Sequence, residues 1–96
     1  MDKNTIIQKL RAIKPILSKK YGVTELALFG SYSRDEQKPE SDIDIMVDFT
    51  KRLGIQFIQL TYDLDEVFSK IKVQTVSKKG IKPAYFEAIK PDLLYV

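Results

Sequence analysis

The 96-residue chain contains no cysteine, no histidine and no tryptophan, and it has only four glycines and four prolines. Without cysteine it forms no disulfides, so a small hydrophobic core must hold the domain together unaided. The absence of both cysteine and histidine disfavours zinc and other transition-metal sites. A bound metal would therefore be a hard, oxygen-binding cation such as Mg²⁺.

Long apolar runs are also missing. No stretch is apolar for long enough to span a bilayer, and the first ten residues lack the apolar core of a secretory signal. The composition, 44% hydrophobic and 30% charged, is ordinary for a globular protein. We therefore expect a single domain over residues 1–96 that resides in the cytoplasm and has no membrane partner.

The net charge of +3 is distributed unevenly along the chain. Residues 1–20 carry six basic and one acidic side chain, residues 21–69 four basic and ten acidic, and residues 70–96 six basic and two acidic. An acidic centre between basic segments suits a cation site whose surroundings attract polyanions. Most of the lysines are nevertheless expected on solvated faces. Those at 70–90 lack interleaved aromatic side chains, so direct nucleic-acid binding ranks last among the functions considered.

The first segment, residues 4–22, has apolar side chains every three or four residues, which predicts an amphipathic helix. Asn4 or Thr5 would cap its start, and Gly22 would end it. Pro15 lies inside this pattern and removes one helical hydrogen-bond donor. We therefore expect a bend or a break at that residue.

The remaining sequence predicts three strands, two helices and an apolar tail. In order, the segments are a strand at 24–30, a strand at 42–49, a helix at 55–70, a strand at 71–77, a helix at 83–90 and the tail at 91–96. The tail would add an edge strand or dock on a partner. The expected fold is α/β (α+β), with a small mixed sheet and helices packed mainly on one face.

The stretch FGSYSRDEQKPESDID, from Phe29 to Asp44, concentrates the polar chemistry of the chain. Alternation along the second strand places Asp42 and Asp44 on the same face, separated only by Ile43. Two carboxylates held this close repel each other, and a divalent cation between them would remove the repulsion. The pattern therefore predicts a Mg²⁺ site at the start of this strand.

Phosphate-binding groups are expected just before the two acids. Gly30 lets the backbone approach a phosphate closely, and the hydroxyl of Ser31 and adjacent N–H groups can donate to it. Arg34 and Lys38 would reach the outer phosphate oxygens, and Ser41 would steady the acids or the phosphate. Each fragment alone is commonly structural, the Gly-Ser pair as a turn and Asp-Ile-Asp as a solvent-facing edge. Only their combination points to function.

A Gly-Ser pair, ten residues and then Asp-x-Asp, flanked by apolar strands, resembles the signature of the nucleotidyltransferase superfamily that includes DNA polymerase beta. The chain length and element order resemble its smallest members, the minimal nucleotidyltransferase (MNT) domains. Many of these are antitoxins encoded beside a HEPN ribonuclease toxin. The resemblance implies that Gly30 and Ser31 bind the triphosphate of ATP or another NTP, and that Asp42 and Asp44 hold Mg²⁺. It also implies a HEPN-family partner, because some members transfer AMP to a tyrosine of the cognate toxin.

The chain departs from the family where the third strand usually supplies a third carboxylate, since the matching residue is Gln74. That carboxylate normally helps to hold a second metal ion, about 3.5–4 Å from the first, and accepts the proton of the nucleophile. Glutamine ligates metal weakly and is no base. We expect transfer to be slower by on the order of 10²–10⁴ unless a partner or another acid replaces the missing group. Asp48, Asp63 and Asp65 are the candidate acids.

Two smaller departures concern the turn between the motifs. Asp35 stands where relatives often have glycine, and aspartate tolerates the left-handed conformation better than most residues. Lys38 stands where arginine is common. It keeps the positive charge but loses bidentate phosphate binding.

Three functions fit these residues. The first is an antitoxin enzyme that transfers AMP from ATP–Mg²⁺ to a HEPN toxin. The second is a binding module that neutralises its partner by contact alone, which Gln74 and the apolar tail favour. The third is nucleotide addition to RNA or to a small molecule such as an aminoglycoside, but family members with those substrates generally carry extra domains. The sequence leaves open the NTP, the acceptor and whether copies of the chain form a homo-oligomer.

Overall fold

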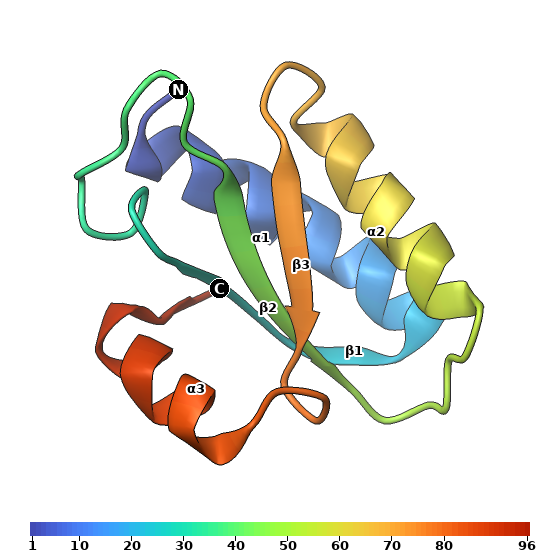
Figure 1. Cartoon of the computed structure of the whole chain (residues 1–96). Helices are drawn as coiled ribbons and strands as arrows, with labels where there is room; N and C mark the ends of the chain where they lie inside the picture. The colour runs from blue at the N-terminus through green and yellow to red at the C-terminus, as the bar shows by residue number, and fades with distance from the viewer.

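A computed structural model describes residues 1–96 as a four-stranded mixed sheet covered by helices (Figure 1). In chain order the elements are α1 (Lys3–Tyr21), β1 (Val23–Phe29), β2 (Ile43–Phe49), α2 (Gln56–Val67), β3 (Val73–Ser77), α3 (Pro83–Ile89), the 3-10 turn η1 (Lys90–Asp92) and β4 (Leu94–Tyr95). The predicted α/β class and element order are confirmed, and the apolar tail supplies the edge strand β4. None of the helices has both the length and the apolar character needed to cross a membrane.

The strands lie in the order β3-β2-β1-β4. β1 runs antiparallel to both β2 and β4, whereas β2 and β3 are parallel. Phe29 at the end of β1 lies opposite Asp44, and Asp44 in turn lies beside Gln74 of β3. The end of β1 and the starts of β2 and β3 therefore meet at one end of the sheet.

Two hydrophobic clusters lie on opposite faces of this sheet. The larger one joins α1 and α2 to the face that bears Ile43, Ile45 and Val47, all fully buried. The smaller one contains Ala27, Phe29 and Met46 of the sheet together with Ile89 of α3. The two long helices thus share one face, as predicted, and the short α3 covers part of the other (Figure 1). The acids at the start of β2 belong to this second face.

Helix α1 differs from the prediction at its start and at its proline. Asp2, not Asn4 or Thr5, is the N-cap, and its Oδ1 accepts a hydrogen bond from the Thr5 N–H at 2.9 Å. The helix continues through Pro15 without a break. Pro15 is exposed, so the carbonyl that loses its helical partner can be solvated. Gly22 ends the helix in the left-handed conformation, as predicted.

Candidate active site

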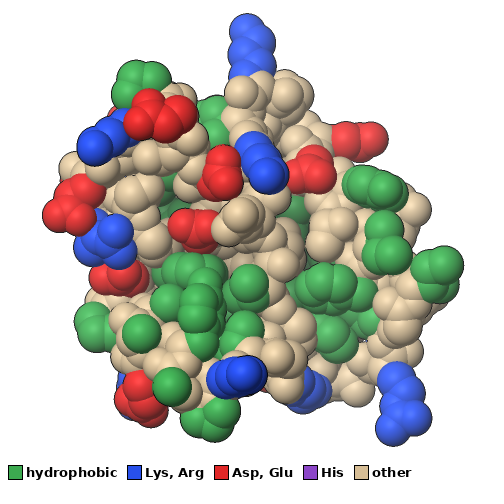
Figure 2. Space-filling view, in the orientation of Figure 1, with side chains coloured by type: hydrophobic (Ala, Val, Ile, Leu, Met, Phe, Trp, Pro, Cys, Tyr) green, Lys and Arg blue, Asp and Glu red, His purple; other side chains and the backbone are tan.

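Asp42 and Asp44, hereafter the acid pair, lie half-buried at the start of β2. Ile43 between them is fully buried on the opposite face, so both acids point away from the larger core. Neither carboxylate forms an ion pair or a hydrogen bond with another group of the chain. In the space-filling view, acidic side chains gather over the start of β2, and apolar side chains lie below them toward α3 (Figure 2).

The pKa of Asp44 is raised above its ordinary value of 3.8. Burial is the larger cause, and the neighbouring charge of Asp42 adds to it. The nearby positive charge of Arg34 acts in the opposite direction. The ionised acid pair is thus held at an electrostatic cost, which a divalent cation between the carboxylates would relieve. These oxygen ligands fit Mg²⁺.

Gly30 brings the backbone directly against the acid pair. Its φ of +79° is left-handed, and a Cβ built on it would lie 2.2 Å from Oδ2 of Asp44. A side chain at this position would therefore need both a strained backbone and a displaced carboxylate. Gly30 and Asp44, which belong to separate parts of the motif, are therefore in direct contact.

The segment Ser31–Glu36, hereafter the site turn, follows Gly30. The Arg34 N–H donates to the Gly30 carbonyl at 3.2 Å, and the Glu36 N–H donates to the Ser31 carbonyl at 2.9 Å. Asp35 closes this turn with a φ of +57°, the only positive φ outside glycine. This closure satisfies carbonyls in the manner of a helix C-terminus. Aspartate thus takes the left-handed conformation expected of it.

The remaining predicted phosphate-binding residues differ in whether their side chains already have hydrogen-bond partners within the chain. Arg34 donates from Nε to Glu36 at 2.7 Å and from Nη1 to Asp92 at 2.6 Å. The Ser41 hydroxyl oxygen accepts a hydrogen bond from the Lys38 N–H at 2.9 Å, which closes a local turn. The Lys38 side chain is exposed. Sequence reasoning missed Asp92, because no local pattern links residues 58 positions apart.

Gln74 occupies the position beside Asp44 in the parallel pair of β2 and β3, so both side chains lie on the same face. Gln74 is exposed. No group of three acidic side chains suited to a metal ion occurs in the chain. The candidate site therefore contains two carboxylates and a neutral amide.

None of the three acids considered as substitutes lies at the site. Asp48 is four residues further along β2, about 13 Å from Asp44 for an extended strand, and it pairs with Lys79. Asp63 accepts hydrogen bonds from Lys20 and from Tyr21, on the helical side of the molecule. Asp65 is exposed on α2, which packs on the other face. The substitution hypothesis is therefore wrong for all three.

The surface around the acid pair is open. The structure has four hollows of about 340–360 Å³, and neither acid nor Gly30 lines any of them. Gly30, the acid pair and Gln74 thus lie together at an accessible end of the sheet.

Comparison with known proteins agrees with this geometry. The sequence profile described as "Nucleotidyltransferase domain" matches residues 10–93. A protein of Methanocaldococcus jannaschii, provisionally named protein adenylyltransferase, is 44% identical over 89 residues, which cover 91% of this chain and 90% of that protein. Protein adenylyltransferase MntA of Thermococcus cleftensis is 35% identical over 88 residues, covering 91% and 88%.

Solved structures agree as well. One provisionally described as a minimal nucleotidyltransferase superposes with a TM-score of 0.82 at 25% identity, covering 98% of this chain and 95% of that one. A complex of a tri-AMPylated HEPN toxin with its MNT antitoxin from Shewanella oneidensis shares the fold, with a TM-score of 0.60, 24% identity, and coverage of 97% and 66%. The chain belongs to the nucleotidyltransferase domain family and is of its minimal, MNT type.

Proposed function

We propose that this chain transfers AMP from ATP–Mg²⁺ to a side chain of a HEPN-family partner protein and thereby acts as an antitoxin. One observation carries the proposal: the Asp44 carboxylate lies against the Gly30 backbone, with Asp42 beside it. Ligands for a cation and a backbone open to phosphate are thus in contact. A nucleoside triphosphate with its Mg²⁺ needs both.

Each residue of the site has a role that its chemistry supports. Gly30 and Ser31 receive the triphosphate, Arg34 and Lys38 face its outer oxygens, and the acid pair holds Mg²⁺. Mg²⁺ there would neutralise the triphosphate and favour attack at the α-phosphoryl group. The acceptor hydroxyl oxygen forms the new bond to the α-phosphorus, the bond to pyrophosphate breaks, and the hydroxyl proton is released. Gln74 cannot take that proton.

The relatives support a protein acceptor. Two of them carry protein adenylyltransferase in their names, and the Shewanella complex holds an AMPylated HEPN toxin. The open surface around the acid pair suits a side chain presented by a folded partner.

A second function is favoured by one observation, the neutral Gln74 beside Asp44. With only two carboxylates, the chain could bind nucleotide without efficient transfer and neutralise its partner by forming a complex. The two functions differ in whether the partner becomes labelled.

The test is incubation with Mg²⁺, the protein of the neighbouring gene, and each of the four NTPs labelled at the α-phosphate. AMP transfer predicts label on the partner from ATP only, lost on chelation of Mg²⁺ and in the Asp42→Asn variant. A stable complex without label, at long incubation, supports the binding module instead. Neither label nor complex contradicts both functions.

A further inference from the structure

Asp92, in the 3-10 turn η1 near the C-terminus, contacts the site turn through both its backbone and its side chain. Its carbonyl accepts a hydrogen bond from the hydroxyl of Ser33, and its Oδ2 lies 2.6 Å from Nη1 of Arg34. Ser33 is the one polar residue among the buried residues of the chain. Ser33 and Arg34, neighbours in the site turn, thus contact the backbone carbonyl and the side-chain carboxylate of the same residue, Asp92.

The segment around Asp92 is firmly attached to the fold. The Leu93 N–H donates to the Lys90 carbonyl, and β4 follows immediately and pairs with β1. The last residue, Val96, donates its N–H to the Leu26 carbonyl at 2.9 Å and accepts from the Lys14 ammonium at 2.6 Å. The C-terminal segment therefore provides a fixed support against which the site turn rests.

Arg34 links this support to the site. Its backbone N–H donates to the carbonyl of Gly30, the residue that lies against Asp44. Two of its nitrogens are occupied, Nε by Glu36 and Nη1 by Asp92, whereas Nη2 makes no hydrogen bond within the chain. The orientation of the guanidinium is thus fixed from one side while a donor edge remains for a phosphate.

An exposed ion pair alone would mean little, because such pairs contribute weakly and are screened by salt. The Asp92 contact differs in its surroundings. The Asp92 side chain is only 19% exposed, against 65% for Glu36, the other partner of Arg34. The buried Ser33 hydroxyl adds a second, uncharged attachment to the same residue.

We propose that Asp92 is a positioning residue of the nucleotide site: it holds the site turn and the Arg34 guanidinium in the orientation that receives the triphosphate. This proposal rests on the nucleotide binding proposed above. Ordering a long arginine side chain before the ligand arrives removes part of the cost of binding. Asp92 itself touches neither the nucleotide nor the metal.

The test compares three variants for binding of ATP–Mg²⁺ by calorimetry at 0.15 M salt. Ser33→Ala removes one attachment without changing any charge, Asp92→Asn removes the ionic attachment while keeping the carbonyl, and Glu36→Gln is the matched control on the exposed side. We expect Ser33→Ala and Asp92→Asn each to weaken binding by about fivefold, as for the loss of one ordinary hydrogen bond. Glu36→Gln should remain within about twofold of the original chain.

The opposite hypothesis is that Asp92 competes with phosphate for Arg34. It predicts that Asp92→Asn tightens binding, with an effect that shrinks as salt rises, and that Ser33→Ala leaves binding unchanged. Either result overturns the positioning role. Backbone hydrogen exchange without nucleotide gives an independent readout, since loss of the support should speed exchange at Arg34 and Glu36. If the original chain fails to bind ATP–Mg²⁺, the proposed function fails. If hydrogen exchange is unchanged in both Ser33→Ala and Asp92→Asn, Asp92 does not support the site turn.

Discussion

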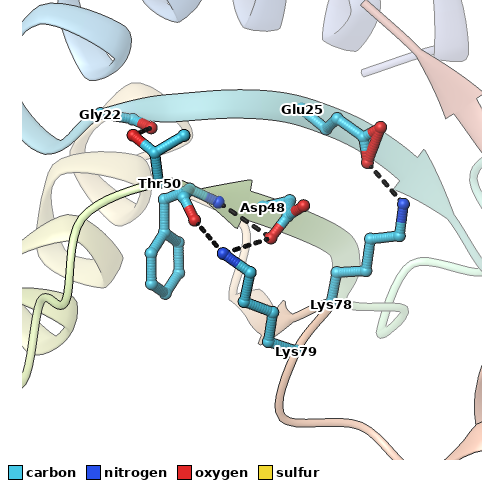
Figure 3. Close-up of polar contacts among 7 residues, drawn as sticks. Gly22, Glu25, Asp48, Thr50, Lys78 and Lys79 are labelled. Carbon is cyan, nitrogen blue, oxygen red and sulfur yellow. Dashed lines mark hydrogen bonds and ion pairs between the residues drawn. The ribbon is translucent and has the colours of Figure 1, made fainter.

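The second face of the sheet has acidic side chains at both ends, but only those at one end have basic partners. At one end lies the acid pair, without a basic partner. At the other end Glu25 and Asp48, which face each other across β1 and β2, each have a lysine (Figure 3). Lys78 lies 2.8 Å from Glu25, and Lys79 lies 3.6 Å from Asp48.

The difference shows that acidic neighbours without a role at the site are paired with basic side chains of the chain itself. The segment after β3 brings two lysines to Glu25 and Asp48, hereafter the lysine-paired acids, so their charges are balanced within the chain. The acid pair is left to repel, and its repulsion is part of what raises the pKa of Asp44. Strain of this kind is typical of sites kept for a ligand rather than for stability.

The largest effect on the labelling rate is expected when an aspartate at the unpaired end is replaced by asparagine, with the same change at the other end as control. Asp42→Asn or Asp44→Asn should lower the rate of labelling of the partner by on the order of 10²–10³, because each removes a ligand of the Mg²⁺ that would balance the charge at the reacting phosphate. Asp48→Asn, on the same strand and face, should leave the rate within about twofold, because Asp48 lies about 13 Å from Asp44 along the strand. Initial rates at saturating ATP measure both. Equal losses at the two ends would contradict the distinction.

Adding an acid to the unpaired end should have the next largest effect. Gln74→Asp places a third carboxylate beside Asp44, where it can take the acceptor proton, and we expect labelling to rise by about 10- to 100-fold. Gln74→Asn is the neutral control and should leave the rate unchanged. If the aspartate variant labels no faster while still binding ATP–Mg²⁺, proton removal does not limit the reaction.

The contact between Gly30 and Asp44 can be broken without altering any charge. Gly30→Ala introduces a Cβ 2.2 Å from Oδ2 of Asp44, so we expect ATP–Mg²⁺ binding to fall by about tenfold or more. Gly54→Ala is the matched control, since Gly54 also has a positive φ, +53°, but no atom within 4 Å of the added Cβ. Both should lose about 1 kcal/mol of stability from the left-handed backbone. Only Gly30→Ala should lose binding.

The smallest effect concerns stability and its dependence on pH. The folded state raises the pKa of Asp44, so ionisation of Asp44 opposes folding, and Asp44→Asn should raise the melting temperature at neutral pH by a few degrees. This gain is fully present above the raised pKa, decreases as pH falls through it, and vanishes below the unfolded value of 3.8. Scanning calorimetry from pH 3.5 to 7.5 measures the gain. If the gain in melting temperature persists at pH 3.5, it comes from packing and not from the charge of Asp44.

Local patterns were sufficient to predict most of the fold. Alternating side chains located β2, and helical spacing located α1 and α2, because each element buries one regular stripe. The face that carries the acid pair followed from the same alternation. Gly30 was singled out because it stands with Ser31 at the end of a predicted strand, shortly before the two acids.

The features that sequence reasoning missed depend on contacts between distant segments. Pro15 was expected to interrupt α1, but Leu10 and Leu17 on either side of it are fully buried, and this packing holds the helix together. Asp92 reaches Arg34 only because β4 returns to pair with β1. Asp48 was considered as a replacement for the missing third carboxylate, but the strand geometry places it about 13 Å from Asp44. No short-range pattern reports any of these distances.

The steric contact between Gly30 and Asp44 has a consequence for how such a domain could decay over evolutionary time. The two halves of the signature occupy the same few ångströms, so a side chain that replaces Gly30 removes the room that Asp44 needs. Descendants that have given up nucleotide chemistry should therefore lose Asp44 before Gly30 or together with it, and replacement of Gly30 while Asp44 remains should be rare.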